Sequence, residues 1–244
     1  MKRLLEALAF LTILPLPPQT KAPRPQALAM FPVAGLVIGA VVAIFTRLVS
    51  LYFPQQITAA VAVCLLAALS GALHLDGLAD TCDGFGSCRP REKILAIMRD
   101  SRIGVMGSVA LLLVLLLKIH ALTAMDKEIQ TAALLLMPLF GRAAIVWQMH
   151  FLPYARKESG AGQLFYQGLG RSALFMATVL PAAALTLVAW KQFLPVAAGV
   201  VIVNLLLVRL CRKKINGATG DTLGAASELT ETIVAVAMTA TLPL

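Results

Sequence analysis

Charge is what this chain has little of. Only 14% of its 244 residues are charged, against about 25% in an ordinary soluble domain. Asp and Glu together number 12, hydrophobic residues make up 59% of the chain, and the mean hydropathy is +0.84. Apolar runs recur from end to end with no long polar linker between them. This pattern excludes a soluble globular protein and predicts one integral membrane domain over residues 1–244.

Cysteine is scarce too, and the four that are present form no C-x-x-C pair. Two lie inside apolar runs, so their spacing indicates neither a disulfide framework nor a zinc site. The sequence also has no G-x-x-x-x-G-K-[ST] motif, which excludes a P-loop. Matching broken helices in two halves are absent as well, which argues against an inverted-repeat transporter. The cysteines are Cys64, Cys82, Cys88 and Cys211.

The N-terminal segment has a basic start and a short apolar run, but it lacks a small-residue cleavage site. We therefore expect it to be retained as a short interfacial or re-entrant helix. The net charge of +9 is better explained by topology and by anionic lipid head groups than by a nucleic-acid partner. The lipid bilayer is the expected partner, and no nucleic acid is expected.

Seven apolar windows are long enough to cross a bilayer, which takes about 20 residues. The predicted fold class is therefore an all-α integral membrane protein. It has about seven transmembrane helices, a short N-terminal interfacial helix and a cytoplasmic amphipathic helix. The windows are residues 30–52, 57–75, 104–124, 130–152, 172–190, 193–211 and 224–244.

Basic residues orient these spans, because Lys and Arg gather on the cytoplasmic side of a membrane. They precede the first span and fill the loops after the second, fourth and sixth spans. The N-terminus is thus predicted inside, the C-terminus outside, and every substantial polar loop in the cytoplasm. Arg47 and Lys118 lie near the outer ends of their spans, where long side chains can snorkel to water.

The long loop after the second span contains "SCRPREKILAIMRDSRIG". This stretch predicts a short amphipathic helix with Pro90 near its first turn. Ile94, Ile97 and Met98 would share one face of that helix. We expect it to lie along the membrane surface.

Three of the few acids stand close together in the same region, as Asp76, Asp80 and Asp83. Their spacing of i, i+4 and i+7 places them on one face if the helix of the second span continues past Leu75. Unpaired carboxylates that close repel one another and call for a cation. Oxygen ligands favour Mg²⁺ or Mn²⁺, and Mg²⁺ usually shares its site with phosphate oxygens. The alternative is that these acids merely balance the basic residues of a solvated loop.

A fourth aspartate, Asp100, follows in "MRDSRIGVMG". Arg99 and Arg102 flank it and are suited to hold phosphate oxygens. Glycines surround these residues and allow close backbone approach. Together with the three acids above, this segment predicts a metal-assisted site for a phosphate-bearing substrate.

Two further cytoplasmic loops carry polar residues that could complete the site. "NGATGDTLGAASELTE" offers Thr219, Gly220 and Asp221 in a turn-rich segment. "YARKESGAGQ" offers Tyr154 and Arg156 beside glycines. Alone, each is weak support for a binding site.

Two other residues stand out because of where they lie. Arg142 sits near the middle of the fourth span, where a charge either lines a functional cavity or pairs with an acid on another span. His74, two residues before Asp76, is the one histidine near the acids. A supporting role beside the acids is expected for it rather than metal ligation.

Three motifs carry a resemblance to a known family. The segments "HLDGLADTCDGFGS", "IMRDSRIGVMG" and "TGDTLGAASELTE" resemble those of cobalamin synthase, the family of membrane-bound adenosylcobinamide-GDP ribazoletransferases. The resemblance covers nearly the whole chain in order and length.

The resemblance implies a reaction. In it, α-ribazole or its 5′-phosphate attacks the cobinamide-linked phosphate of adenosylcobinamide-GDP. GMP leaves, and adenosylcobalamin or its phosphate forms. Mg²⁺ is the implied cofactor and the bacterial inner membrane the implied location. Whether the chain forms a homo-oligomer is left open.

The resemblance and the acid pattern together give each candidate residue a role. The expected metal ligands are Asp76, Asp80, Asp83 and Asp100. The expected catalytic residues are Asp83, Asp100 and Arg102, with the choice of base among the carboxylates left open. The expected substrate-binding residues are His74, Arg99, Arg142, Arg156, Thr219, Gly220 and Asp221.

Two other functions remain as alternatives. A CDP-alcohol phosphotransferase shares Asp80-x-x-Asp83-Gly84, but the rest of that signature is missing here. A cation transporter would use acids to bind the passing ion. Its acids usually lie near the middle of several spans rather than at one rim.

Overall fold

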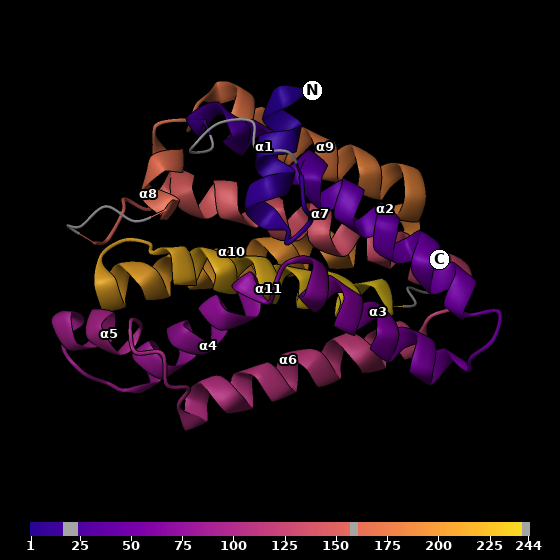
Figure 1. The fold of residues 1–244 in the computed structure, drawn as a ribbon, viewed down its shortest axis with the longest axis horizontal. Coiled ribbons are helices and arrows are strands. Elements are labelled where there is room, and N and C mark those ends of the chain that lie inside the picture. Colours follow the sequence, from indigo (N-terminus) through magenta and orange to yellow (C-terminus); the bar gives the residue numbers. More distant parts are fainter. Residues whose placement is uncertain (17–23, 157–160, 241–244) are drawn as a thin grey trace.

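The computed structural model describes residues 1–16, 24–156 and 161–240 (Figure 1). Within these ranges it is helical, and its one β-bridge joins Tyr154 to Ala218. The predicted all-α class is confirmed. In chain order the helices are α1 (Lys2–Leu11), the 3₁₀ helix η1 (Pro25–Met30), α2 (Phe31–Val49), α3 (Gln55–Leu69), α4 (Leu73–Gly86), α5 (Arg91–Ile97), α6 (Val105–Ala124), α7 (Lys127–Phe151), α8 (Ala161–Tyr166), α9 (Arg171–Ala189), the 3₁₀ helix η2 (Trp190–Gln192), α10 (Phe193–Ile215) and α11 (Gly220–Met238).

Helices α7 and α11 form the centre of the bundle. Helix α7 packs against α2, α9 and α11, while α11 also packs against α4, α6 and α10. In α7, 83% of the most apolar window is buried by protein, against 22% in the stretch of α9 and α10. Small residues permit close helix approach: a Cβ on Gly39 of α2 would lie 2.6 Å from the carbonyl oxygen of Leu134 in α7.

Fewer separate stretches qualify as membrane spans than the seven predicted. Four helical stretches are long and apolar enough, and a fifth qualifies if α3 and α4 count as one bent span. One of the four, Arg171–Ile215, contains both the fifth and the sixth predicted windows. Helix α11 carries Asp221, Glu228 and Glu231, too many acids for an apolar span. The count of seven is therefore not confirmed.

The second predicted span breaks before the acids. Gly71 and Ala72 both have φ of +57°, a left-handed conformation that glycine tolerates and alanine rarely adopts. Helix α4 begins at Leu73 and runs at 88° to α3. The helix of the second span thus does not continue straight past Leu75. The turn sends α4 across α11, which is what places the acids.

The two short helices predicted near the membrane surface both form, and both contact the protein. In α1, Ala7 and Leu11 are fully buried. In α5, Ile94 and Met98 are 1% and 2% exposed, and they pack in a cluster with Ala155 and Ile215. The apolar face of α5 therefore covers protein rather than lipid.

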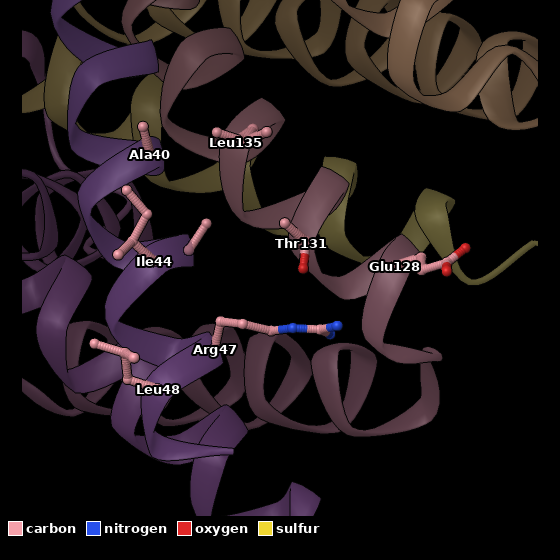
Figure 2. A pocket seen from close by; sticks show the side chains of 8 residues that line it. Ala40, Ile44, Arg47, Leu48, Glu128, Thr131 and Leu135 are labelled. Atoms are coloured by element: carbon pink, nitrogen blue, oxygen red, sulfur yellow. The ribbon is translucent and has the colours of Figure 1, made fainter. Parts of the chain in front are cut away.

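One end of the bundle gathers the polar segments. There α4 and α5 meet the starts of α6 and α11 and the ends of α7 and α10, on the left of Figure 1. We call this the polar end. At the opposite end, α2 and α7 border an open cavity of ≈ 630 Å³. Figure 2 shows Arg47 extended across this outer cavity, between Leu48 and the start of α7. Arg47 is exposed there, as a snorkelling side chain would be.

Candidate functional site

Helix α4 crosses α11 in close contact at the polar end. A Cβ on Gly77 would lie 2.7 Å from the carbonyl oxygen of Asp221, and one on Gly224 would lie 3.3 Å from the Cα of His74. A side chain at position 77 would press against the backbone of α11, so the close crossing depends on glycine there. The glycines near the acids thus serve helix packing, and the crossing brings Asp76 and Asp80 beside Asp221.

Asp76 and Asp80 lie on the polar part of α4, beyond the apolar run. Asp76 is exposed and Asp80 is half-buried. Burial, followed by the charge of Asp76, raises the pKa of Asp80 to about 6, with smaller contributions from Asp221 and Asp83. Three neighbouring carboxylates thus add to the effect of burial at this crossing, and a cation would offset their charge.

Asp83, in contrast, holds the start of α6. Its Oδ2 accepts a hydrogen bond of 2.7 Å from the backbone N–H of Gly104, and its Oδ1 accepts one of 2.8 Å from that of Gly107. A carboxylate at a helix N-terminus is favourable because it pairs with otherwise unbonded amides and with the helix dipole. Sequence spacing alone could not show that both oxygens of Asp83 are engaged here. Its roles as metal ligand and catalytic residue stay predictions.

Asp100 and Arg102 form an exposed pair in the loop before α6. Nη2 and Nε of Arg102 donate to Asp100 at 2.7 and 3.0 Å, and its backbone N–H donates at 3.1 Å. These hydrogen bonds hold the pKa of Asp100 at about 2. Arg99 is exposed in the same turn. Among the described residues, no three or more His, Cys, Asp or Glu side chains converge as a metal site. The predicted ligand set of four aspartates is therefore not assembled in this structure.

The two other polar loops meet at the crossing. Beside the bridge between Tyr154 and Ala218, the backbone N–H of Ala155 donates to the carbonyl of Ala218 at 2.8 Å. The N–H of Ala218 donates to the carbonyl of Pro153 at the same distance. Nη2 of Arg156 donates to Oδ2 of Asp221 at 2.7 Å. Two loops that are about 60 residues apart in the chain thus form one wall of the site, as the sequence suggested.

Thr219 begins α11 as its N-cap. Its hydroxyl accepts from the backbone N–H of Thr222, and the hydroxyl of Thr222 accepts from the N–H of Thr219. The Thr219 hydroxyl also donates to Asp221 at 3.2 Å. Gly220 has open space around it, with no other atom within 4 Å of a Cβ placed there. The first turn of α11 is therefore fixed in place and open on one side.

Arg142 does not reach the site. Its guanidinium is 2% exposed and donates to Glu231 on α11. Lys118 of α6 also pairs with Glu231, at 2.8 Å, and with Glu228, at 2.5 Å. Of the two alternatives for Arg142, the structure shows the salt bridge, and its substrate-binding role stays a prediction. The prediction that Lys118 snorkels to water is wrong, because its side chain is 3% exposed.

Sequence reasoning missed two features of the polar end. Arg91, in the first turn of α5, donates from Nη2 to the carbonyl of Ala155 at 2.6 Å and from Nε to that of Ile215 at 2.9 Å. It thereby fastens α5 to the loops. The second feature is a cavity of ≈ 150 Å³ beside the acids, which we call the aromatic pocket. Its residues come from separate helices, so no local sequence pattern predicts this pocket. They are Phe10, Leu11, Phe31, Leu73, His74, Asp76, Gly77, Ile145, Met149, Phe165, Gly220, Asp221, Leu223 and Gly224.

His74 is part of the wall of the aromatic pocket. It is 2% exposed, and its Nδ1 has no hydrogen-bond partner among the described residues. His74 thus lies beside the acids, and the supporting role predicted for it stays a prediction. The binding of substrate by His74 stays a prediction.

The fold and site define a class: an all-α membrane protein with an acidic helix crossing at one end of its bundle. Comparison with known proteins makes this specific. The family described as "Cobalamin-5-phosphate synthase" matches residues 3–239. The chain belongs to this family, as its three motifs predicted.

Similar proteins named "Adenosylcobinamide-GDP ribazoletransferase" occur in several bacteria. That of Roseiflexus sp. is 40% identical over 242 residues, covering 98% of this chain and 90% of its own. That of Syntrophobacter fumaroxidans is 39% identical, covering 93% and 94%. That of Thermoanaerobacter sp. is 35% identical, covering 94% of each chain. No solved structure matches the chain significantly.

Proposed function

We propose that the chain is an adenosylcobinamide-GDP ribazoletransferase. It joins α-ribazole, or α-ribazole 5′-phosphate, to adenosylcobinamide-GDP and releases GMP. The product is adenosylcobalamin or its 5′-phosphate. The observation that carries this proposal is the family match over residues 3–239, which includes both helices of the acidic crossing.

The reaction exchanges a phosphoanhydride bond for a phosphate ester bond. A ribose hydroxyl oxygen forms a bond to the cobinamide-linked phosphorus, and the bond from that phosphorus to the GMP oxygen breaks. The hydroxyl proton passes to a carboxylate or to water, and GMP departs with the bonding electrons. No covalent bond to the protein is needed, so the chain has to position the reactants and balance negative charge.

Mg²⁺ fits the acidic crossing as the cation that balances this charge. Asp76 and Asp80 are the carboxylates available to hold it, and Asp221 lies beside them. One or two protein carboxylates completed by phosphate oxygens is the usual Mg²⁺ environment. When bound, the ion would neutralise diphosphate charge. Asp83 and Asp100 can join only after their present hydrogen bonds to α6 and Arg102 open.

Basic side chains at the rim are suited to the phosphates. The side chain of Arg102 is 86% exposed and that of Arg156 is 16% exposed. Each is already paired with an aspartate, so an incoming phosphate would exchange one oxyanion partner for another. Arg99 extends the same basic rim.

The location follows from the charge pattern. We propose that the protein is a multi-pass protein of the bacterial inner membrane with its polar end in the cytoplasm. The basic loops support this orientation. Soluble nucleotide substrates reach the acidic crossing from that side.

The test is turnover by the purified protein in lipid. Adenosylcobinamide-GDP, α-ribazole and Mg²⁺ are supplied, and GMP and corrinoid product are followed together. We expect equal amounts of both from wild type, dependence on Mg²⁺, and loss of both in Asp80→Asn. Asp126→Asn is the matched control, because Asp126 caps α7 far from the crossing and Asn caps about as well.

Three outcomes would contradict the proposal. Folded protein that gives neither product would refute it. Release of CMP from a CDP-alcohol would favour the phospholipid enzyme, and ion flux without turnover would favour a transporter. Full activity of Asp80→Asn would keep the reaction and refute the assigned metal site.

A further inference from the structure

The aromatic pocket borders the acidic crossing directly. Asp76 and Asp221 belong to its wall, and so do Gly77 and Gly220. Away from the acids the wall is apolar, formed by side chains of α1, α2, α7, α8 and α11. The pocket thus has polar residues on the side that borders the crossing, which we take as its mouth, and apart from His74 apolar residues elsewhere.

Three phenylalanines form one side of the interior. Phe165 makes edge-to-face contacts with Phe10 and Phe31, with ring centroids 4.7 and 5.0 Å apart. Phe31 and Phe165 are almost fully buried, so their positions are fixed by packing. Aromatic walls of this kind favour flat aromatic guests, which stack on ring faces or meet ring edges.

The volume also suits a ring. An engineered apolar cavity of about 150 Å³ in another protein binds benzene, and the pocket here measures ≈ 150 Å³. A bicyclic ring is larger than benzene. If it enters from the side of Asp76 and Asp221, such a ring can go in with one edge first and leave its substituent outside.

We propose that the aromatic pocket binds the base of ribazole and so places the ribose at the acidic crossing. This inference rests on the proposed function. Ribazole is the ribonucleoside of 5,6-dimethylbenzimidazole, a flat and largely apolar base. With its methylated edge toward the phenylalanines, the ribose emerges at the mouth beside Asp76 and Asp221. The attacking hydroxyl then stands where phosphate and cation are held.

The other substrate fits the pocket less well. The corrin ring of adenosylcobinamide-GDP is far too large for ≈ 150 Å³. Guanine has the right shape, but its edges carry several donors and acceptors. Buried against phenylalanine and leucine side chains, these groups would lose hydrogen bonds to water without replacement.

The polar content of the wall matches ribazole. A ribazole base has one ring nitrogen free to accept a hydrogen bond. His74 is the imidazole in the wall, and its buried Nδ1 lacks a partner among the described residues. A rotation of this side chain on binding would satisfy both groups.

Filling the pocket tests the proposal. Ile145→Phe enlarges a lining side chain of α7, and Met149→Phe does the same one helical turn further along. Leu135→Phe is the matched control, since Leu135 lies on α7 but borders the outer cavity of Figure 2. All three are compared with wild type in lipid nanodiscs after size-exclusion chromatography has confirmed that each is folded.

We expect the pocket variants to raise KM for α-ribazole about 10-fold or more, the range found when a hydrophobic pocket no longer fits its ligand. The KM for adenosylcobinamide-GDP should stay within about twofold. Leu135→Phe should change neither value. A second readout is binding of free 5,6-dimethylbenzimidazole by equilibrium dialysis, with empty nanodiscs subtracted. Both pocket variants should lose this binding.

The outcomes separate the two proposals. If folded wild type shows no turnover, the proposed function fails. If it turns over and both pocket variants keep the wild-type KM for ribazole, only the pocket assignment is overturned. A rise confined to the KM for adenosylcobinamide-GDP would assign the pocket to guanine and overturn the ribazole assignment. Displacement of the bound base by GMP but not by ribazole would do the same.

Discussion

Asp83 shows how one carboxylate can resemble a metal ligand in sequence and act as a helix cap in structure. Its spacing from Asp76 and Asp80 places it on the same stripe of α4. Both of its oxygens nevertheless accept backbone hydrogen bonds from the start of α6. The carboxylate therefore ties α4 to α6, and it does so at the edge of the acidic crossing.

Replacement of Asp83 should reduce stability according to how much of the cap remains. Asp83→Ala removes both acceptors and should cost about 1–2 kcal/mol, as other lost N-terminal caps do. Asp83→Asn keeps one acceptor oxygen and should cost less. Thermal unfolding in detergent measures both. Asp126→Ala, at the cap of α7, should lose similar stability yet keep the turnover of the folded protein. An Asp83→Ala protein that melts like wild type would show that the two hydrogen bonds contribute little.

At the scale of elements, the crossing of α4 and α11 is the feature that builds the site. It depends on two backbone properties: the left-handed pair at Gly71 and Ala72, which turns the chain, and Gly77, which lets the helices touch. A different direction of α4, or a larger distance between α4 and α11, would move the acids of α4 away from Asp221. The site is thus set by helix geometry as much as by its carboxylates.

Gly77→Ala tests this dependence. The added Cβ would lie 2.7 Å from the carbonyl oxygen of Asp221, so the helices must separate, and overpacking of this kind costs about 1–3 kcal/mol. We expect a lower melting temperature and a loss of turnover that exceeds the loss of folded protein. Gly170→Ser is the control, because nothing lies within 4 Å of a Cβ there. Wild-type turnover in Gly77→Ala would mean that the close approach is not required.

The sequence predicted those parts of the molecule that depend on local spacing. The helical class, the stripe of Asp76 and Asp80 and the turn at Thr219 follow from residues a few positions apart. The bend at Gly71 did not follow, because a glycine in an apolar run can lie within a straight membrane helix as well as at a bend. Nor did the partners of Lys118, since pairing between helices distant in sequence leaves no mark in one chain. The aromatic pocket is formed by helices from both ends of the sequence, so it could not be predicted from local spacing either.

At the scale of the whole molecule, four buried charges join three helices. Lys118 of α6 and Arg142 of α7 face Glu228 and Glu231 of α11, and the two charges of each sign balance. Balanced and bonded, such a group is tolerated in an apolar interior. A single missing partner leaves a charge there without compensation, which is strongly destabilising.

Glu231→Gln should therefore destabilise the protein by about 3–5 kcal/mol, the cost of an unpaired buried charge. Adding Arg142→Met restores the balance, since Lys118 keeps Glu228. We expect the double variant to recover most of the lost melting temperature, measured in detergent beside the exposed control Glu128→Gln. A double variant less stable than Glu231→Gln alone would show that charge balance is not what the network maintains.

The short length of α3 has a consequence for the lipid around the protein. Its 15 residues give a rise of about 22 Å, less than the roughly 30 Å of a hydrocarbon core. Such a mismatch thins the surrounding leaflet and draws head groups inward. We therefore expect the acidic crossing, attached to the end of α3, to lie near the depth of the lipid phosphates. A substrate with a diphosphate and a bulky, partly apolar ring system would find polar head groups for its diphosphate there, and lipid hydrocarbon for its ring system.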